Sequence, residues 1–98
     1  MKYPIPELVD FNVLIKYRRP VIGSRLMEAA EESVFKKSDR VGIGVGLFSG
    51  YGNAQRLYVK RGYVPDRRGI YKEGRFARFG DDVTFDDNLV LYFTKELK

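Results

Sequence analysis

Apolar and polar residues along the chain follow two different periods, and these periods divide it into strands and helices. Residues 8–15 alternate between apolar and polar side chains, which predicts a half-buried strand. Between Ile22 and Val34 the apolar residues recur every three or four positions, which predicts an amphipathic helix with charged residues, Glu31 among them, on its solvent face. Residues 41–47 alternate again, with glycine at every second position, and predict a second strand.

The second half of the chain predicts a shorter helix and further strands. Residues 53–61 carry one apolar stripe at helical spacing, and Gly62 is placed to end that helix as a left-handed cap, with Tyr63 folded back on the last turn. Residues 66–69 predict a turn, residues 70–72 a short strand, residues 73–87 a long polar connection, and residues 89–94 a buried strand. The order β-α-β-α-β-β indicates the α/β (α+β) class, with a mixed sheet and two flanking helices.

The composition is that of one soluble domain spanning residues 1–98. Of the 98 residues 44% are hydrophobic and 32% are charged, with 7 Phe and 7 Tyr, which excludes a disordered chain. The absence of cysteine and histidine excludes disulfides and the commonest metal ligands, so we expect no metal and catalysis only by Tyr, Asp, Glu, Lys or backbone groups. No stretch approaches the roughly 20 apolar residues of a membrane span, and we expect a cytoplasmic protein without membrane contact.

The formal net charge of +5 favours anionic partners, and the segment from Arg18 to Arg25 is where such a partner is expected. It joins the first predicted strand to the first predicted helix and contains Arg19 and Ser24. A helix start offers unpaired N–H groups and the positive end of the helix dipole, which together suit a pyrophosphate. The alternative is that Ser24 only caps the helix while the arginines are solvated.

The same segment resembles the coenzyme loop of GNAT-superfamily N-acetyltransferases. Their motif is Gln/Arg-x-x-Gly-x-Gly/Ala, and the loop binds the pyrophosphate of CoA through main-chain N–H groups. Arg18 and Gly23 match the motif, whereas Val21 replaces its first glycine and Pro20 lacks an N–H donor. The resemblance implies weakened but retained CoA binding. It assigns the pyrophosphate to Arg18, Arg19, Val21, Ile22, Gly23, Ser24 and Arg25.

A second resemblance to the same family lies in the second predicted helix. The family segment is Asn-x-x-Ala-x-x-Leu-Tyr-x-Lys-x-Gly-Phe/Tyr, which we read onto the residues from Asn53 to Tyr63. The resemblance implies that Asn53 contacts the pantetheine arm and that Tyr58 is the general acid that protonates the departing thiolate. A phenol with a pKa near 10 is protonated at neutral pH and suits this role. The alternative is that Tyr58 is an ordinary core residue.

The predicted strands supply the remaining parts of the implied site. In the family, the strands corresponding to residues 8–15 and 41–47 diverge, and the acyl-pantetheine lies in the split. The resemblance implies that the backbone of Val13, Leu14 and Ile15 pairs with the pantetheine like an added strand. The glycines of residues 41–47 fit a close approach by a ligand, or equally by a helix of the same chain. Asp10 is a less favoured candidate for the general base that deprotonates the acceptor amine.

The resemblance covers residues 5–97 and corresponds to the C-terminal portion of the GNAT fold, so we expect a truncated domain. Residues 8–15 would then present an open strand edge, from which we expect a homo-oligomer. The expected function is transfer of an acetyl group from acetyl-CoA to a primary amine of an unidentified acceptor. One alternative is a catalytically inactive CoA-binding remnant. A basic nucleic-acid-binding module ranks last, because no nucleic-acid motif accompanies its arginines, which are Arg67, Arg68, Arg75 and Arg78.

Overall fold

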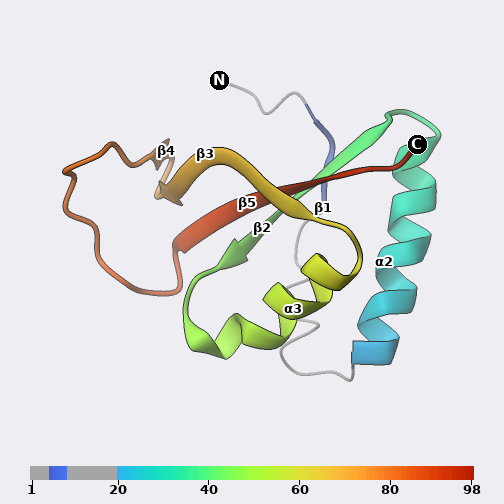
Figure 1. The fold of residues 1–98 in the computed structure, drawn as a ribbon, viewed down its shortest axis with the longest axis horizontal. Coiled ribbons are helices and arrows are strands. Elements are labelled where there is room, and N and C mark those ends of the chain that lie inside the picture. The colour runs from blue at the N-terminus through green and yellow to red at the C-terminus, as the bar shows by residue number, and fades with distance from the viewer. Residues whose placement is uncertain (1–4, 9–19) are drawn as a thin grey trace.

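The structure is a computed structural model that describes the backbone of residues 5–8 and 20–98 and the side chains of residues 5–8 and 23–98. Its elements, in chain order, are β1 (Glu7–Leu8), α2 (Pro20–Phe35), β2 (Arg40–Gly46), the 3-10 helix η1 (Ser49–Tyr51), α3 (Gly52–Lys60), β3 (Val64–Lys72), β4 (Arg75–Phe76) and β5 (Leu89–Glu96). They form an α+β domain with a mixed sheet and helices on one face (Figure 1). Of the strand predicted over residues 8–15, only Leu8 lies within the described residues.

The sheet has the strand order β1-β2-β5-β3-β4, so the last strand lies between β2 and β3. β1 runs parallel to β2, with Glu7 opposite Gly42 and Leu8 opposite Ile43. The remaining neighbours are antiparallel, and β5 pairs along the whole length of β2. Figure 1 shows the C-terminus beside the end of α2, where Leu97 N donates to Asp39 O at 2.7 Å.

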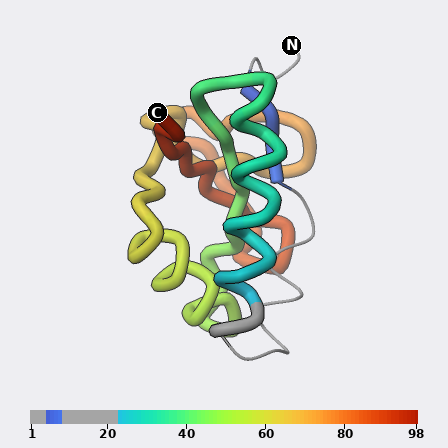
Figure 2. The backbone as a smooth tube through the Cα atoms, turned by 90° about the vertical axis from the view of Figure 1, so that its right-hand side faces the viewer, coloured from blue at the N-terminus to red at the C-terminus, as the bar shows by residue number. Residues whose placement is uncertain are grey.

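The hydrophobic core lies between the sheet and both helices. Alternation puts one side of β2 against the helices, and its valines and isoleucine are almost completely buried. Figure 2, turned by 90° from Figure 1, shows α2 nearest the viewer with the strands behind it. The buried cluster consists of Leu8, Met27, Val41, Ile43, Val45, Ala54, Leu57, Tyr58, Tyr63 and Phe93. Within the described residues neither helix has the length and apolar composition needed to cross a membrane.

The glycines on the other side of β2 accommodate aromatic rings of the same chain. A Cβ atom on Gly44 would lie 2.9 Å from Cε1 of Tyr92, and one on Gly46 would lie 2.5 Å from Cδ2 of Tyr51. Both distances are shorter than van der Waals contact, so a larger residue would force the ring to move. At these two positions the close approach is therefore made by side chains of β5 and η1.

The predicted turn over residues 66–69 is wrong, because these residues lie inside the continuous strand β3. They form a bulge: the pairing with β5 shifts between Pro65, opposite Phe93, and Ile70, opposite Leu91. Arg67 and Gly69 have positive φ angles of 75° and 84°. Left-handed backbone occurs both in turns and in some bulges, which explains the turn-like composition of this segment.

The polar connection predicted over residues 73–87 contains an additional hairpin. Strand β4 folds back on β3, with Tyr71 opposite Phe76 and Lys72 opposite Arg75. The tight turn at Glu73 and Gly74 has φ angles of 47° and 95°, as a hairpin turn with two left-handed residues requires. The rest of the connection projects away from the sheet at the left of Figure 1.

Candidate functional site

The first helix begins where the sequence predicts an anion site. α2 starts at Pro20, and proline at the first helical position costs no hydrogen bond. Val21 and Ile22 lie in its first turn, with Gly23 buried, Ser24 partly buried and Arg25 exposed on the following positions. The first turn carries no acidic side chain. The described backbone therefore provides the helix start that the coenzyme loop requires.

Other predicted site residues lie outside the described residues, and their roles remain predictions. They are Asp10, Val13, Leu14, Ile15, Arg18 and Arg19.

Tyr58 lies in the core and is completely buried. It shares the hydrophobic cluster with Leu8 and Ile43, which face each other where β1 and β2 pair. Its ring centroid is 5.9 Å from that of Tyr63, and the main-chain N of Tyr63 donates to Tyr58 O at 2.9 Å. Burial raises the pKa of Tyr58, so the phenol is protonated at neutral pH. The predicted general acid is thus a neutral phenol in the same core cluster as Leu8 and Ile43.

Asn53 lies exposed in the first turn of α3. It directly precedes Ala54, whereas the family motif has two residues between its asparagine and its alanine. That spacing puts the motif's asparagine position at Tyr51, so the residues that fit the motif begin at Ala54. The pantetheine role assigned to Asn53 therefore has no support from the motif. The predicted cap is confirmed, because Gly62 has a φ of 97° directly after α3.

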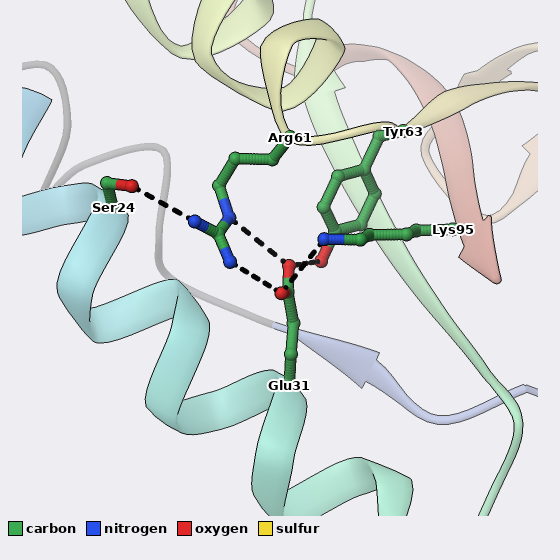
Figure 3. Close-up of polar contacts among 5 residues, drawn as sticks. All are labelled: Ser24, Glu31, Arg61, Tyr63 and Lys95. Carbon is green, nitrogen blue, oxygen red and sulfur yellow. Dashed lines mark hydrogen bonds and ion pairs between the residues drawn. The ribbon is translucent and has the colours of Figure 1, made fainter. Parts of the chain in front are cut away.

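The prediction that Glu31 lies on the solvent face of its helix is wrong, because Glu31 is only 6% exposed. Its carboxylate lies among side chains from three parts of the fold (Figure 3). Arg61 donates to it from Nη2 at 2.6 Å and from Nε at 3.4 Å. The hydroxyl of Tyr63 donates at 2.7 Å, and Nζ of Lys95 donates at 3.0 Å. We call Glu31, Arg61, Tyr63 and Lys95 the Glu31 cluster.

The Glu31 cluster reaches the N-terminal part of α2 through Arg61. Its guanidinium donates from Nη1 to Ser24 Oγ at 3.0 Å while its other side binds Glu31 (Figure 3). Arg61 is the C-cap residue directly after α3, so one side chain joins the end of α3 to the first turns of α2.

The electrostatics of the Glu31 cluster follow from burial and pairing. Burial raises the pKa of Glu31, but hydrogen bonds from Arg61, Tyr63 and Lys95 outweigh it and hold that pKa below its ordinary value. The hydrogen bond to Glu31 raises the pKa of Arg61. Burial, with the hydrogen bond to Glu31, raises the pKa of Tyr63. At neutral pH one carboxylate therefore faces two cations and a neutral phenol, and the charge of Glu28 also acts on Arg61.

Two of the four arginines considered for nucleic-acid binding, Arg68 and Arg75, have partners within the chain. Arg68 lies over the rings of Phe76 and Tyr92, at 4.5 Å and 5.3 Å from the centroids. Arg75 donates to Asp81 at 3.2 Å. These rings also contact one another, with Tyr71 at 5.0 Å from Phe76 and 5.4 Å from Tyr92. Phe79, in contrast, is fully exposed.

Metal chemistry receives no support from the described part of the chain, where no cluster of three or more Asp and Glu side chains is placed to hold a metal ion. Comparison with models of known protein families, with curated proteins and with solved structures finds no significant match to this chain.

Proposed function

We propose that this chain is a GNAT-type N-acetyltransferase that binds acetyl-CoA and transfers its acetyl group to a primary amine. The observation that carries the proposal is the location of Tyr58 in the buried core cluster that also contains Leu8 and Ile43, which face each other where β1 pairs with β2. In the family that this sequence resembles, the acyl-pantetheine lies between the corresponding strands and the corresponding tyrosine protonates the thiolate. The motif residue and the residues of the strand contact thus belong to one core cluster.

The start of α2 supports the phosphate end of the same proposal. A helix of 16 residues presents unpaired N–H groups and the positive end of its dipole at Pro20, where it begins. The first turn has no carboxylate to repel an anion. Ser24, in the following turn of the helix, adds a hydroxyl, and its neighbour Arg25 is exposed.

The proposed reaction is direct transfer. The amine nitrogen forms a bond to the acetyl carbonyl carbon, the carbon–sulfur bond breaks, and the sulfur leaves as a thiolate that takes a proton from Tyr58. The raised pKa of Tyr58 keeps the phenol protonated until that step. The attacking nitrogen loses one of its protons as the neutral amide forms, and the phenolate recovers a proton from it through solvent.

Thermal melting with and without acetyl-CoA tests coenzyme binding. At 100 times the dissociation constant, a ligand adds about 2.7 kcal/mol of stability, which raises Tm by about 10–20 °C in a domain of this size. No shift at millimolar acetyl-CoA would overturn the proposal. The Tyr58→Phe variant should keep the shift and lose most of its turnover, measured as CoA release with a panel of amines. Equal loss of shift and turnover would make Tyr58 structural.

A second candidate function, coenzyme binding without transfer, is favoured by the complete burial of Tyr58. A phenol with no exposed surface reaches a thiolate only if the groups that cover it move. Under this reading acetyl-CoA still raises Tm, but no amine releases CoA faster than buffer does. The release assay therefore separates the two candidates.

Self-association is proposed as part of the same function. Among the described strands β1 is at one edge of the sheet, and an edge strand offers its N–H and C=O groups to a second copy. Sedimentation at micromolar concentration should give a dimer or larger species, and a monodisperse monomer would contradict this.

A further inference from the structure

Arg61 is held in one orientation by a buried carboxylate on one side and presents a donor to Ser24 on the other. Its Nε and Nη2 bind Glu31, and its Nη1 binds Ser24 Oγ (Figure 3). The side chains of Arg61 and Glu31 are 16% and 8% exposed. The planar guanidinium can satisfy both partners at once only in this orientation, because its N–H groups have a fixed geometry.

The hydrogen bond from Arg61 makes the Ser24 hydroxyl oxygen an acceptor and leaves its proton for another partner. In the part of the chain that the structure describes, Ser24 makes this one hydrogen bond, as acceptor, and its proton is left to be donated. A hydroxyl that accepts from a cation is polarised and becomes a stronger donor. An anionic oxygen is the partner that such a donor binds best.

We propose that Arg61 is a positioning residue for the coenzyme pyrophosphate, acting through the hydroxyl of Ser24. The inference rests on the proposed function and extends it: Glu31 fixes Arg61, Arg61 fixes the Ser24 oxygen, and the Ser24 proton points to a phosphate oxygen at the start of α2. Lys95 is the matched comparison, because it binds the same Glu31 carboxylate without contacting Ser24.

The test is the dissociation constant of CoA, measured by isothermal titration calorimetry on the whole chain. We expect the wild-type chain to bind CoA. Ser24→Ala and Arg61→Gln should each raise the dissociation constant about tenfold, because each loses one charge-assisted hydrogen bond, and tenfold corresponds to about 1.4 kcal/mol. The double variant should also be about tenfold weaker rather than a hundredfold, because both changes remove the same contact. Lys95→Gln should lower Tm and leave the dissociation constant unchanged. If Arg61→Gln fails to fold, Arg61→Lys, which retains the positive charge, replaces it in the binding measurement.

Each outcome of this titration supports or overturns the role proposed for Arg61. A wild-type chain that binds no CoA overturns the proposed function and this inference together. Binding by wild type with no loss in Arg61→Gln, or in Arg61→Lys if that variant is the one that folds, overturns the inference alone. The same holds if Lys95→Gln weakens binding as much as the Arg61 variant, since the effect would then be general destabilisation. A hundredfold loss in the double variant would mean that Arg61 acts independently of Ser24.

Discussion

Replacing Glu31 with glutamine removes the negative charge around which Arg61, Tyr63 and Lys95 are arranged. Glutamine keeps the length and shape of the side chain, so the change separates charge from packing. The side chains of Arg61 and Lys95 are 16% and 21% exposed, and water can replace the lost carboxylate only in part. Removing one partner of a fully buried ion pair costs about 3–5 kcal/mol, and the residual exposure lowers our expectation to about 2–3 kcal/mol.

Urea unfolding and thermal melting followed by circular dichroism measure this loss. In a domain of this size each kcal/mol lowers Tm by about 4–8 °C, so Glu31→Gln should melt about 10–20 °C below wild type. Glu32→Gln is the matched control, because Glu32 is exposed on the same helix and its replacement should change stability by less than about 0.5 kcal/mol. Equal effects of the two variants would refute the role assigned to the Glu31 cluster.

The same variant has a defined pH dependence. The pKa of Glu31 is lower in the folded protein than its ordinary value of 4.5. The stabilisation by Glu31 is therefore fully present above the unfolded pKa and is lost as the pH falls through the lower folded pKa. The stability difference between wild type and Glu31→Gln should be constant near neutral pH and should shrink below about pH 4. A difference that grows on acidification would refute the charge-based explanation.

Two glycine positions give further predictions. Gly46→Ala should lower stability by about 1–3 kcal/mol because its Cβ would lie 2.5 Å from Cδ2 of Tyr51, whereas Gly52→Ala, with open space around its Cβ, should cause no loss. Urea titrations compare the two, and equal stability would contradict the Gly46 contact. Gly62→Ala should cost about 1–2 kcal/mol because the φ of 97° is unfavourable for a residue with a Cβ. Thermal melting checks this, and an unchanged Tm would show that α3 ends differently in solution.

Much of the fold is predictable because its signals are local. Alternating valine and isoleucine in β2, the apolar stripe of α3 and the glycine cap at Gly62 each act within a few residues. The bulge in β3 is different, since residues 66–69 have turn-like composition and only the pairing of Pro65 and Ile70 with β5 makes them part of a strand. That pairing is a property of the sheet and cannot be read from the segment.

The site was less predictable for the same reason. Glu31 is four residues after the buried Met27 and three before Val34, so it lies on the apolar stripe of α2, but its charge indicated solvent. Its burial depends on Arg61 and Lys95, which are 30 and 64 residues away in the sequence. Tyr58 was identified from its motif, whereas its complete burial depends on a core cluster to which other elements contribute, with Leu8 from β1 and Ile43 from β2.

Titration of acetyl-CoA into isotopically labelled protein, followed by backbone amide chemical shifts, tests the proposed coenzyme site most directly. Coenzyme between β1 and β2 and at the start of α2 should shift the amides of Leu8, Ile43 and Ser24 first, with saturable dose dependence. The amides of Tyr71 and Phe76, on the far part of the sheet, should remain unchanged. No shifts at millimolar acetyl-CoA, or shifts confined to Tyr71 and Phe76, would contradict the proposed site.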